Sequence, residues 1–188
     1  MPFSQGEPER DKDFPPIGYR RLTVRDWTIM KVSEYFPGLL GRVAELHGRY
    51  YHRHWGFGLF FEAKVATEMA AFLERFDPAR DGLWIVVAED RIIGAVAIVG
   101  QDAGTVEARL RWLIVAPEHQ GRGIGKVLMQ EAVAFCRHAG FRRVWLTTFA
   151  GLDAARHIYE KEGFHLLEER EDAHWGKTVP EQTFELLS

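Results

Sequence analysis

The stretch that decides the fold reads Ala116-Pro117-Glu118-His119-Gln120-Gly121-Arg122-Gly123-Ile124-Gly125-Lys126. It follows a predicted strand and opens a predicted helix, so several backbone N–H groups at the helix start have no intrahelical partner. The helix dipole adds about half a positive charge at this end, and Arg122 and Lys126 add formal charge. Because glycines let a ligand approach the backbone closely, the stretch predicts a phosphate or pyrophosphate site.

Two better-known phosphate loops do not fit this stretch. The dinucleotide pattern Gly-x-Gly-x-x-Gly needs a third glycine where Lys126 stands. The Walker pattern needs a glycine where Gln120 stands and a hydroxyl where Val127 stands. Neither a dinucleotide fold nor a Walker-type nucleotide site is therefore predicted.

Upstream of this stretch, the periodicity predicts one strand and two helices. Residues 27–35 are strand-like, and Pro37-Gly38 ends them. The apolar stripe of the first helix is Leu39, Val43, Leu46, Tyr50 and His54. The stripe of the second helix is Phe61, Val65, Met69, Phe72 and Phe76, closed by Asp77-Pro78.

After residue 82 the pattern becomes rich in strands. Leu83–Ala88 and Ile92–Val99 are predicted as an adjacent pair, and Thr105–Val115 alternates as a third strand. One face of the third strand is expected to carry Glu107, Arg109, Arg111, Leu113 and Val115, and the other Ala108, Leu110, Trp112 and Ile114.

The rest of the chain alternates between helices and strands. The helix after the glycines has the stripe Ile124, Leu128, Ala132, Phe135 and Ala139 and ends at Gly140. The elements expected after it are a strand Val144–Phe149, a helix Asp153–Glu162, and closing strands Phe164–Leu167 and Thr183–Leu187. This order predicts an α/β domain with a mixed sheet.

Composition predicts one soluble globular domain. The 188 residues are 46% hydrophobic and 27% charged. Residues 1–18 are polar and proline-containing and are expected to form a flexible leader, with a single domain over 19–188. The lone Cys136 excludes an internal disulfide and fits a reducing compartment. No apolar run is long enough to span a bilayer and no signal peptide is evident, so a cytoplasmic protein is expected.

Charge is distributed unevenly along the chain. The net charge is −3, but residues 108–143 hold seven Lys+Arg against two Asp+Glu, a net of +5 that leaves −8 for the rest. A basic segment in an acidic protein indicates a local anion site rather than a nucleic-acid surface. An RNA-binding adaptor is disfavoured by the isoelectric point near 6.2 and by the lack of recognition motifs.

Two motifs together resemble a known family. Residues 120–125 match Gln/Arg-x-x-Gly-x-Gly/Ala, and Tyr159 to Phe164 match Tyr-x-x-x-Gly-Phe. With these two motifs in this order, the chain resembles the GNAT (Gcn5-related N-acetyltransferase) superfamily over roughly residues 27–187. It is most similar to bacterial members with His-Gly-Arg-Tyr-Tyr, here 47–51, and Gly-Phe-Gly-Leu-Phe-Phe-Glu-Ala-Lys, here 56–64. The resemblance implies the GNAT (acyl-CoA N-acyltransferase) fold, with a mixed, mostly antiparallel central sheet flanked by helices.

The resemblance also implies an activity and a co-substrate. Acetyl-CoA would donate its acetyl group directly to a primary amine, without a covalent enzyme intermediate and without a metal, because a thioester is already activated. The pantetheine arm would bond to strand backbone as an added strand, and one strand N–H would polarise the thioester carbonyl. The implied cofactor-binding residues are Leu113, Ile114, Val115, Gln120, Gly121, Arg122, Gly123, Ile124, Gly125 and Lys126.

Proton transfer has one candidate acid and several candidate bases. Tyr159 matches the family tyrosine that protonates the departing CoA thiolate, although packing against Ile158 and Phe164 would also explain it. Many relatives place a glutamate at the position aligned with Arg109. The base is therefore left open between Glu107, Glu62, His47 and a water chain, and for each of these side chains a solvated or structurally paired role is favoured over catalysis.

At two further positions, the sequence does not indicate a functional side chain. Many relatives have an asparagine that contacts the cofactor near Phe149, where this chain offers only the hydroxyls of Thr147 and Thr148. Cys136 is expected to be a core residue.

The amine acceptor is not identified by the sequence. The candidate substrate-binding residues are His47, Tyr51, Glu62, Arg109 and Arg111. The two arginines would meet an acidic acceptor or balance an acidic cluster formed by Glu168, Glu169, Glu171 and Asp172. An aromatic cluster, expected to be mostly core with one or two members lining the acceptor pocket, comprises Tyr50, Tyr51, Trp55, Phe57, Phe60 and Phe61.

The sequence gives less support to a metal site, to other partners and to a function other than acetyl transfer. His47, His52 and His54 lack the carboxylate or cysteine that would complete a metal site. The expected partner is a small-molecule or peptide amine, with no nucleic acid and no membrane, and a homodimer is left open. The alternative function is a non-enzymatic acyl-CoA sensor that uses the same loop.

Overall fold

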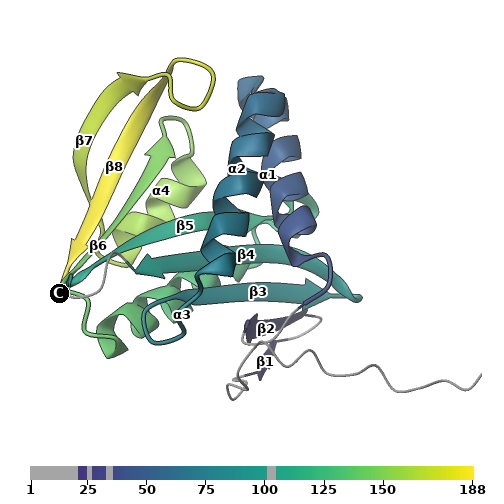
Figure 1. Ribbon diagram of the computed structural model, residues 1–188, viewed down its shortest axis with the longest axis vertical. Coiled ribbons are helices and arrows are strands. Elements are labelled where there is room, and N and C mark those ends of the chain that lie inside the picture. Colours follow the sequence, from purple (N-terminus) through teal and green to yellow (C-terminus); the bar gives the residue numbers. More distant parts are fainter. Residues whose placement is uncertain (1–20, 25–26, 33–35, 101–104) are drawn as a thin grey trace, which may run out of the picture.

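The computed structural model describes residues 21–24, 27–32, 36–100 and 105–188 (Figure 1). The elements are β1 (Arg21–Val24), β2 (Trp27–Lys31), α1 (Leu39–Trp55), α2 (Leu59–Glu74), β3 (Gly82–Ala88), β4 (Arg91–Gly100), β5 (Glu107–Val115), a 3-10 turn (Pro117–His119), α3 (Ile124–His138), β6 (Arg143–Phe149), α4 (Asp153–Lys161), β7 (His165–Asp172) and β8 (Val179–Leu187). The expected leader, residues 1–18, lies outside the described residues.

All eight of these strands form one sheet in the order β1-β2-β3-β4-β5-β6-β8-β7. Every neighbouring pair is antiparallel except β5 and β6, which run parallel. The parallel pair is joined by α3, as a parallel connection requires a crossover. The mixed, mostly antiparallel sheet expected from the sequence is confirmed.

Helices cover both faces of this sheet (Figure 1). On one face, Arg111 of β5 pairs with Glu68 of α2, and α1 packs against the same strands. On the opposite face, a Cβ added to Gly94 of β4 would meet Leu128 and Ile124 of α3 at 3.3 and 3.4 Å. The helix α4 packs beside α3. Both expected apolar stripes are buried near their centres, including Val43 of α1 and Met69 of α2.

A bulge in β5 overturns the expected alternation of its side chains. Ala95 pairs with Ile114 and Ala97 with Arg111, so one residue of β4 faces two of β5, and Trp112 has a φ of 52°. Paired residues share a face, and the register therefore turns Ile114 to the side of Arg111. The expectation that Val115 shares the face of Arg111 is wrong, because one extra residue reverses the side chains that follow the bulge.

Several element boundaries differ from expectation. The first expected strand ends at Lys31, before Val32, and residues 33–35 lie outside the described part of the chain. Both closing strands are longer than expected, because charged residues extend β7 and buried polar residues extend β8. Among the described residues, no helix has the length and apolar character needed to cross a membrane.

Candidate active site

The strands β5 and β6 separate beyond the start of their pairing. Their register runs only from Glu107 with Arg143 to Arg109 with Trp145. A cavity of about 550 Å³ opens at the far end of β5. Its walls include the strand end Leu113–Val115, the glycine turn, and residues of α4 such as Ile158 and Tyr159. An open strand edge of this kind can accept an extended ligand as an added strand.

The glycine turn forms one wall of this cavity. Gly121 and Gly123 have φ angles of 73° and 83°, and a Cβ at either would meet nothing within 4 Å. Gly123 is the N-cap of α3, which has neither a side-chain cap nor an acidic residue in its first turn. The first N–H groups of α3 are thus left for an anion, with the positive end of the dipole behind them.

Most of the predicted cofactor residues line this cavity. They are Leu113, Ile114, Val115, Gln120, Gly121, Gly123, Ile124, Gly125 and Lys126. Gln120 also donates from Nε2 to the Val115 carbonyl oxygen at 3.0 Å, which ties the turn to the strand end. Arg122 is exposed and is not among the lining residues. His119 lines the cavity and was missed because nothing in its spacing marks it.

A second, smaller cavity of about 80 Å³ lies against the α1 and α2 face of the sheet. It is lined by His47, Tyr51, Phe61, Val65, Arg109, Leu110, Arg111, Trp112, Leu113, Leu146, Thr147, Thr148, Phe149, Tyr159 and Trp175. Tyr51, Leu113 and Tyr159 line both cavities. The two cavities therefore meet at these three residues, and the second one is called the acceptor cavity below.

Tyr159 stands at this meeting point. Its side chain is buried, and its ring contacts Phe164 and Phe184. Burial raises the pKa of its phenol to about 12, and a hydrogen bond with Thr148 opposes that rise. The phenol therefore carries its proton at neutral pH.

His47 is buried in the wall of the acceptor cavity. Its Nδ1 lies 2.8 Å from the carbonyl oxygen of Val43, so Nδ1 must carry the hydrogen and Nε2 the lone pair. Burial lowers the pKa of the imidazole to about 4, and the charge of Arg111 lowers it further. His47 is thus a neutral hydrogen-bond acceptor at its free nitrogen.

The other base candidates lie away from the cavities. Glu107 pairs with Arg143 at 3.4 Å at the start of β5, and Glu62 is exposed on α2. Neither lines either cavity among the described residues. Cys136 is buried, as expected, and burial raises the pKa of its thiol to about 12. A thiol held in this form is not a reactive nucleophile.

The aromatic cluster is mostly packed as expected. Tyr51 is its centre, with ring centroids 4.9 Å from Phe61, 5.3 Å from Tyr50 and 5.5 Å from Phe149. Burial raises the pKa of the Tyr51 phenol. Phe60 differs from expectation because it is 60% exposed. Phe149, which replaces the family asparagine, belongs to the packed cluster.

The two arginines of β5 have different partners. Arg111 pairs with Glu68 of α2, which also bonds to Lys64 at 2.9 Å. Arg109 donates from Nη2 to Thr147 Oγ1 at 2.8 Å and stacks 4.5 Å over the ring of Trp145. Arg111 is therefore balanced by Glu68 rather than by the acidic residues of β7. Sequence reasoning missed Glu68 because its helix spacing marks only an exposed pair with Lys64.

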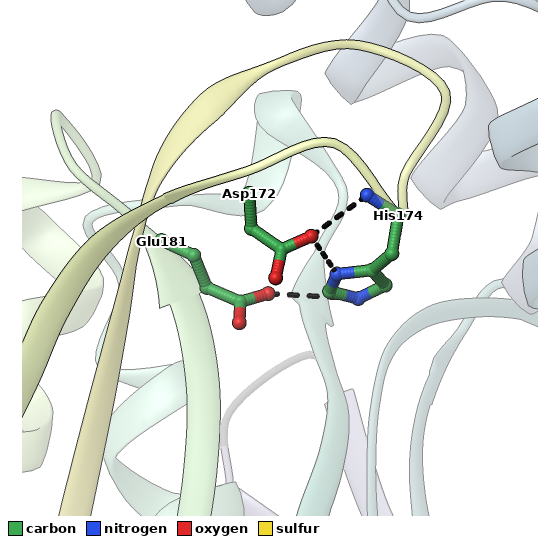
Figure 2. A group of neighbouring side chains, drawn as sticks. All are labelled: Asp172, His174 and Glu181. Atoms are coloured by element: carbon green, nitrogen blue, oxygen red, sulfur yellow. Dashed lines mark hydrogen bonds and ion pairs between the residues drawn. The ribbon is translucent and has the colours of Figure 1, made fainter.

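Trp175 reaches the acceptor cavity from the loop between β7 and β8. Figure 2 shows the group that holds this loop: His174 donates from its backbone N and from Nδ1 to Asp172 Oδ1, at 2.8 and 2.6 Å. Glu181 of β8 lies 3.6 Å from His174 Nε2 and accepts a 2.8 Å bond from the Trp175 indole. The three side chains have ligand atoms within 4.8 Å of one another. The contacts of Asp172, His174 and Glu181 hold the Trp175 indole against the acceptor cavity.

Comparison with known proteins agrees with this geometry. The sequence model of the acetyltransferase (GNAT) family matches residues 40–164, about two thirds of the chain. The chain belongs to the GNAT acetyltransferase family. That match runs from α1 through the glycine turn to the end of α4 and includes the lining residues of both cavities except Trp175.

Individual GNAT relatives are distant. The chain is 30% identical to N-acetylaspartate synthetase of Danio rerio over 66% of its length, and 33% identical to streptothricin acetyltransferase of Streptomyces lavendulae over 43%. The matches cover 44% and 43% of those proteins, so the chain spans less than half of each relative's length. YncA of Salmonella typhimurium, solved with its cofactor acetyl-CoA, superposes with a TM-score of 0.64 at 13% identity, covering 87% of this chain and 94% of that one. This likeness shows the shared fold.

Proposed function

We propose that this GNAT protein is an N-acetyltransferase that moves the acetyl group of acetyl-CoA to a primary amine by direct attack. The observation that carries the proposal is the meeting of two cavities at Tyr51, Leu113 and Tyr159. A donor in the larger cavity and an acceptor in the smaller one would bring their reacting atoms together there. Alignment of two bound reactants supplies much of the rate enhancement in a transfer of this kind.

The larger cavity fits the cofactor. Its glycine turn presents the N–H groups of the α3 start to a pyrophosphate, because Gly121 and Gly123 leave the space in front of them open. The open edge of β5 at Leu113–Val115 offers backbone groups to the pantetheine amides. When bound, acetyl-CoA supplies an activated acetyl thioester. A backbone N–H of the same strand end would stabilise the charge that develops on the carbonyl oxygen.

Two buried side chains would take part in proton transfer. Tyr159 keeps its proton at neutral pH and can donate it to the departing sulfur. The lone pair of His47 Nε2 can accept a hydrogen bond from the attacking amine, with water carrying the proton onward. Because two guanidinium groups and no carboxylate line the described acceptor cavity, an ammonium ion is disfavoured there and the amine loses its proton more readily.

Expectations about the acceptor, metal requirement, compartment and partners follow from the same proposal. The names of the relatives, N-acetylaspartate synthetase and streptothricin acetyltransferase, support an amine acceptor. The proposed chemistry needs no metal, because the thioester is already activated. A lone buried thiol suits the cytoplasm, and the net charge of −3 gives no reason to expect nucleic acid or membrane partners. A homodimer remains open.

Release of free CoA thiol in the presence of acetyl-CoA and a panel of amines tests the proposal. The panel contains amino acids, simple alkylamines, diamines and short peptides, with mass spectrometry of the acetylated product. We expect acetyl-CoA-dependent release with at least one class. Tight CoA binding without turnover on any class would overturn the proposal and leave an acyl-CoA sensor.

A further inference from the structure

The acceptor cavity contains a half-buried cation with an incomplete set of partners. The guanidinium of Arg109 makes one hydrogen bond, from Nη2 to Thr147, and its Nε is buried without a hydrogen-bond partner. No carboxylate of the described residues lies within ion-pair distance of it, whereas Arg111 on the same strand has Glu68. Arginine presents five donors in a rigid fork, so most of the fork of Arg109 is left for a ligand.

The surroundings of Arg109 hold this fork in one place. The ring of Trp145 lies 4.5 Å below the guanidinium, and Thr147 fixes one nitrogen. Glu68 and Glu181 raise the pKa of Arg109 through their charge, but burial and the neighbouring charge of Arg111 outweigh them and lower it to about 10. A partly buried charge without an ion-pair partner is costly, and a preorganised guanidinium is a common device for binding an oxyanion.

We propose that the acceptor amine also carries a carboxylate, and that Arg109 binds this carboxylate. The inference rests on the proposed function, because it names the substrate class of the same cavity. The flat fork of Arg109 matches the two oxygens of a carboxylate, and a cavity of about 80 Å³ suits a small group. The same charge disfavours a polycationic acceptor, because a second ammonium would lie beside the guanidinium of Arg109, which has no ion-pair partner among the described residues.

Matched acceptors test the inference by kcat/KM. Each set contains an amino acid with one to four carbons between amine and carboxylate, its primary amide, the corresponding alkylamine and the diamine. We expect the best amino acid to exceed its amide by about tenfold to hundredfold, the worth of a charge-assisted bond to a buried group. An amide, alkylamine or diamine used as well as the amino acid would overturn the inference and leave the proposed function intact.

Variants assign the preference to Arg109. Arg109→Gln should bring the ratio of acid to amide close to one, mainly through KM for the acid, and Arg109→Lys should keep part of it. Arg49→Gln removes a positive charge from an exposed side chain on α1 and should leave the ratio unchanged. Melting temperatures show whether the variants fold. An unchanged ratio in folded Arg109→Gln would also overturn the inference.

A binding measurement separates this inference from the proposed function. Calorimetry with CoA present compares an N-acetyl amino acid with its N-acetyl amide, and it requires no turnover. If no amine is acetylated, the proposed function fails, yet tighter binding of the N-acetyl acid that is lost in Arg109→Gln still supports a carboxylate site. Equal binding of the two compounds overturns the carboxylate site whether or not the protein is active.

Discussion

Two buried side chains that line the acceptor cavity, His47 and Tyr159, are kept neutral by the same physical cause. Burial lowers the pKa of His47 to about 4 and raises that of Tyr159 to about 12. Removal from water penalises the charged form of each group, so a base becomes weaker and an acid becomes weaker. A CoA thiolate formed in the same cavity would be destabilised as well, which favours its protonation by the phenol.

His47 should make stability depend on pH. Its folded pKa near 4 lies below the ordinary value of 6.5, so the unfolded chain binds more protons in between. Stability is then fully present above about pH 6.5 and is lost as the pH falls toward 4, by up to about 3 kcal/mol from this group. Urea unfolding of the wild type and of His47→Gln should show a smaller loss in the variant. The exposed His138→Gln serves as control, and equal losses in wild type and His47→Gln would contradict the assignment.

Tyr159→Phe separates catalysis from packing. The variant keeps the ring contacts with Phe164 and Phe184 but removes the proton. Because a positioned acid contributes about 10²–10⁴ in rate, we expect kcat at saturation to fall about a hundredfold with little change in CoA affinity. Turnover of saturated enzyme and CoA calorimetry measure the two quantities. An unchanged kcat would show that Tyr159 only packs.

At the residue scale, the sequence predicted which residues line the larger cavity better than it predicted which side chains pair with one another. The positions of Tyr159 and the glycine turn follow from local motifs, which carry their spacing within a few residues. The pairing of Arg111 with Glu68 joins residues 43 positions apart, and the approach of Trp175 to the acceptor cavity depends on a hairpin loop. Contacts of this kind depend on how separate elements pack and leave no local pattern.

At the scale of elements, the start of α3 determines how an anion can bind. Gly123 ends the turn with a φ of 83° in front of open space, and Gly140 follows the same helix with a φ of 76°, also in open space. The two glycines have the same backbone conformation at opposite ends of one helix. Only the first faces the cavity.

Alanine at these two glycines gives a matched pair. Both Gly123→Ala and Gly140→Ala should lose roughly 1–2 kcal/mol of stability, because a side chain is strained at positive φ. Only Gly123→Ala should weaken CoA binding, by about tenfold or more, since its methyl group would enter the space in front of the helix N–H groups. Chemical unfolding and CoA calorimetry measure the two effects. Equal weakening in both variants would show that strain alone lowers affinity.

Helices and strands could be predicted from the sequence where buried side chains recur at a regular spacing. The stripes of α1, α2 and α3 and the strands β3 and β4 follow apolar patterns and were found. Most of β7 was missed because Glu168, Glu169, Arg170 and Glu171 are all exposed, so an edge strand there has no buried face. The bulge at Trp112 was missed because its cause is the pairing with β4, while the residues themselves alternate without a break.

At the scale of the whole molecule, the sheet has two parts, and the split between them lies where β5 and β6 stop pairing. The strands β1 to β5 lie on one side of the split, and β6, β8 and β7 lie on the other (Figure 1). Their ladder covers only the start of β5. Further along, Tyr51 of α1 contacts Phe149 of β6 with ring centroids 5.5 Å apart, and Lys177 Nζ donates to the Trp55 carbonyl oxygen at 2.8 Å. The larger cavity is lined by the end of β5, residues 113–115, and by residues of α4, which follows β6.

Cofactor binding should therefore stabilise both sides of the split together. With CoA at about a hundred times its Kd, amides that exchange only through opening of the split should exchange about a hundredfold more slowly, equivalent to about 2.7 kcal/mol. We expect this slowing at the end of β5, residues 113–115, and in α4, with β2 and β3 unaffected. Hydrogen exchange with and without CoA measures it, and Gly123→Ala should need proportionally more CoA for the same protection. Slowing confined to residues 120–126 would mean that CoA binds the turn without bridging the two parts of the sheet.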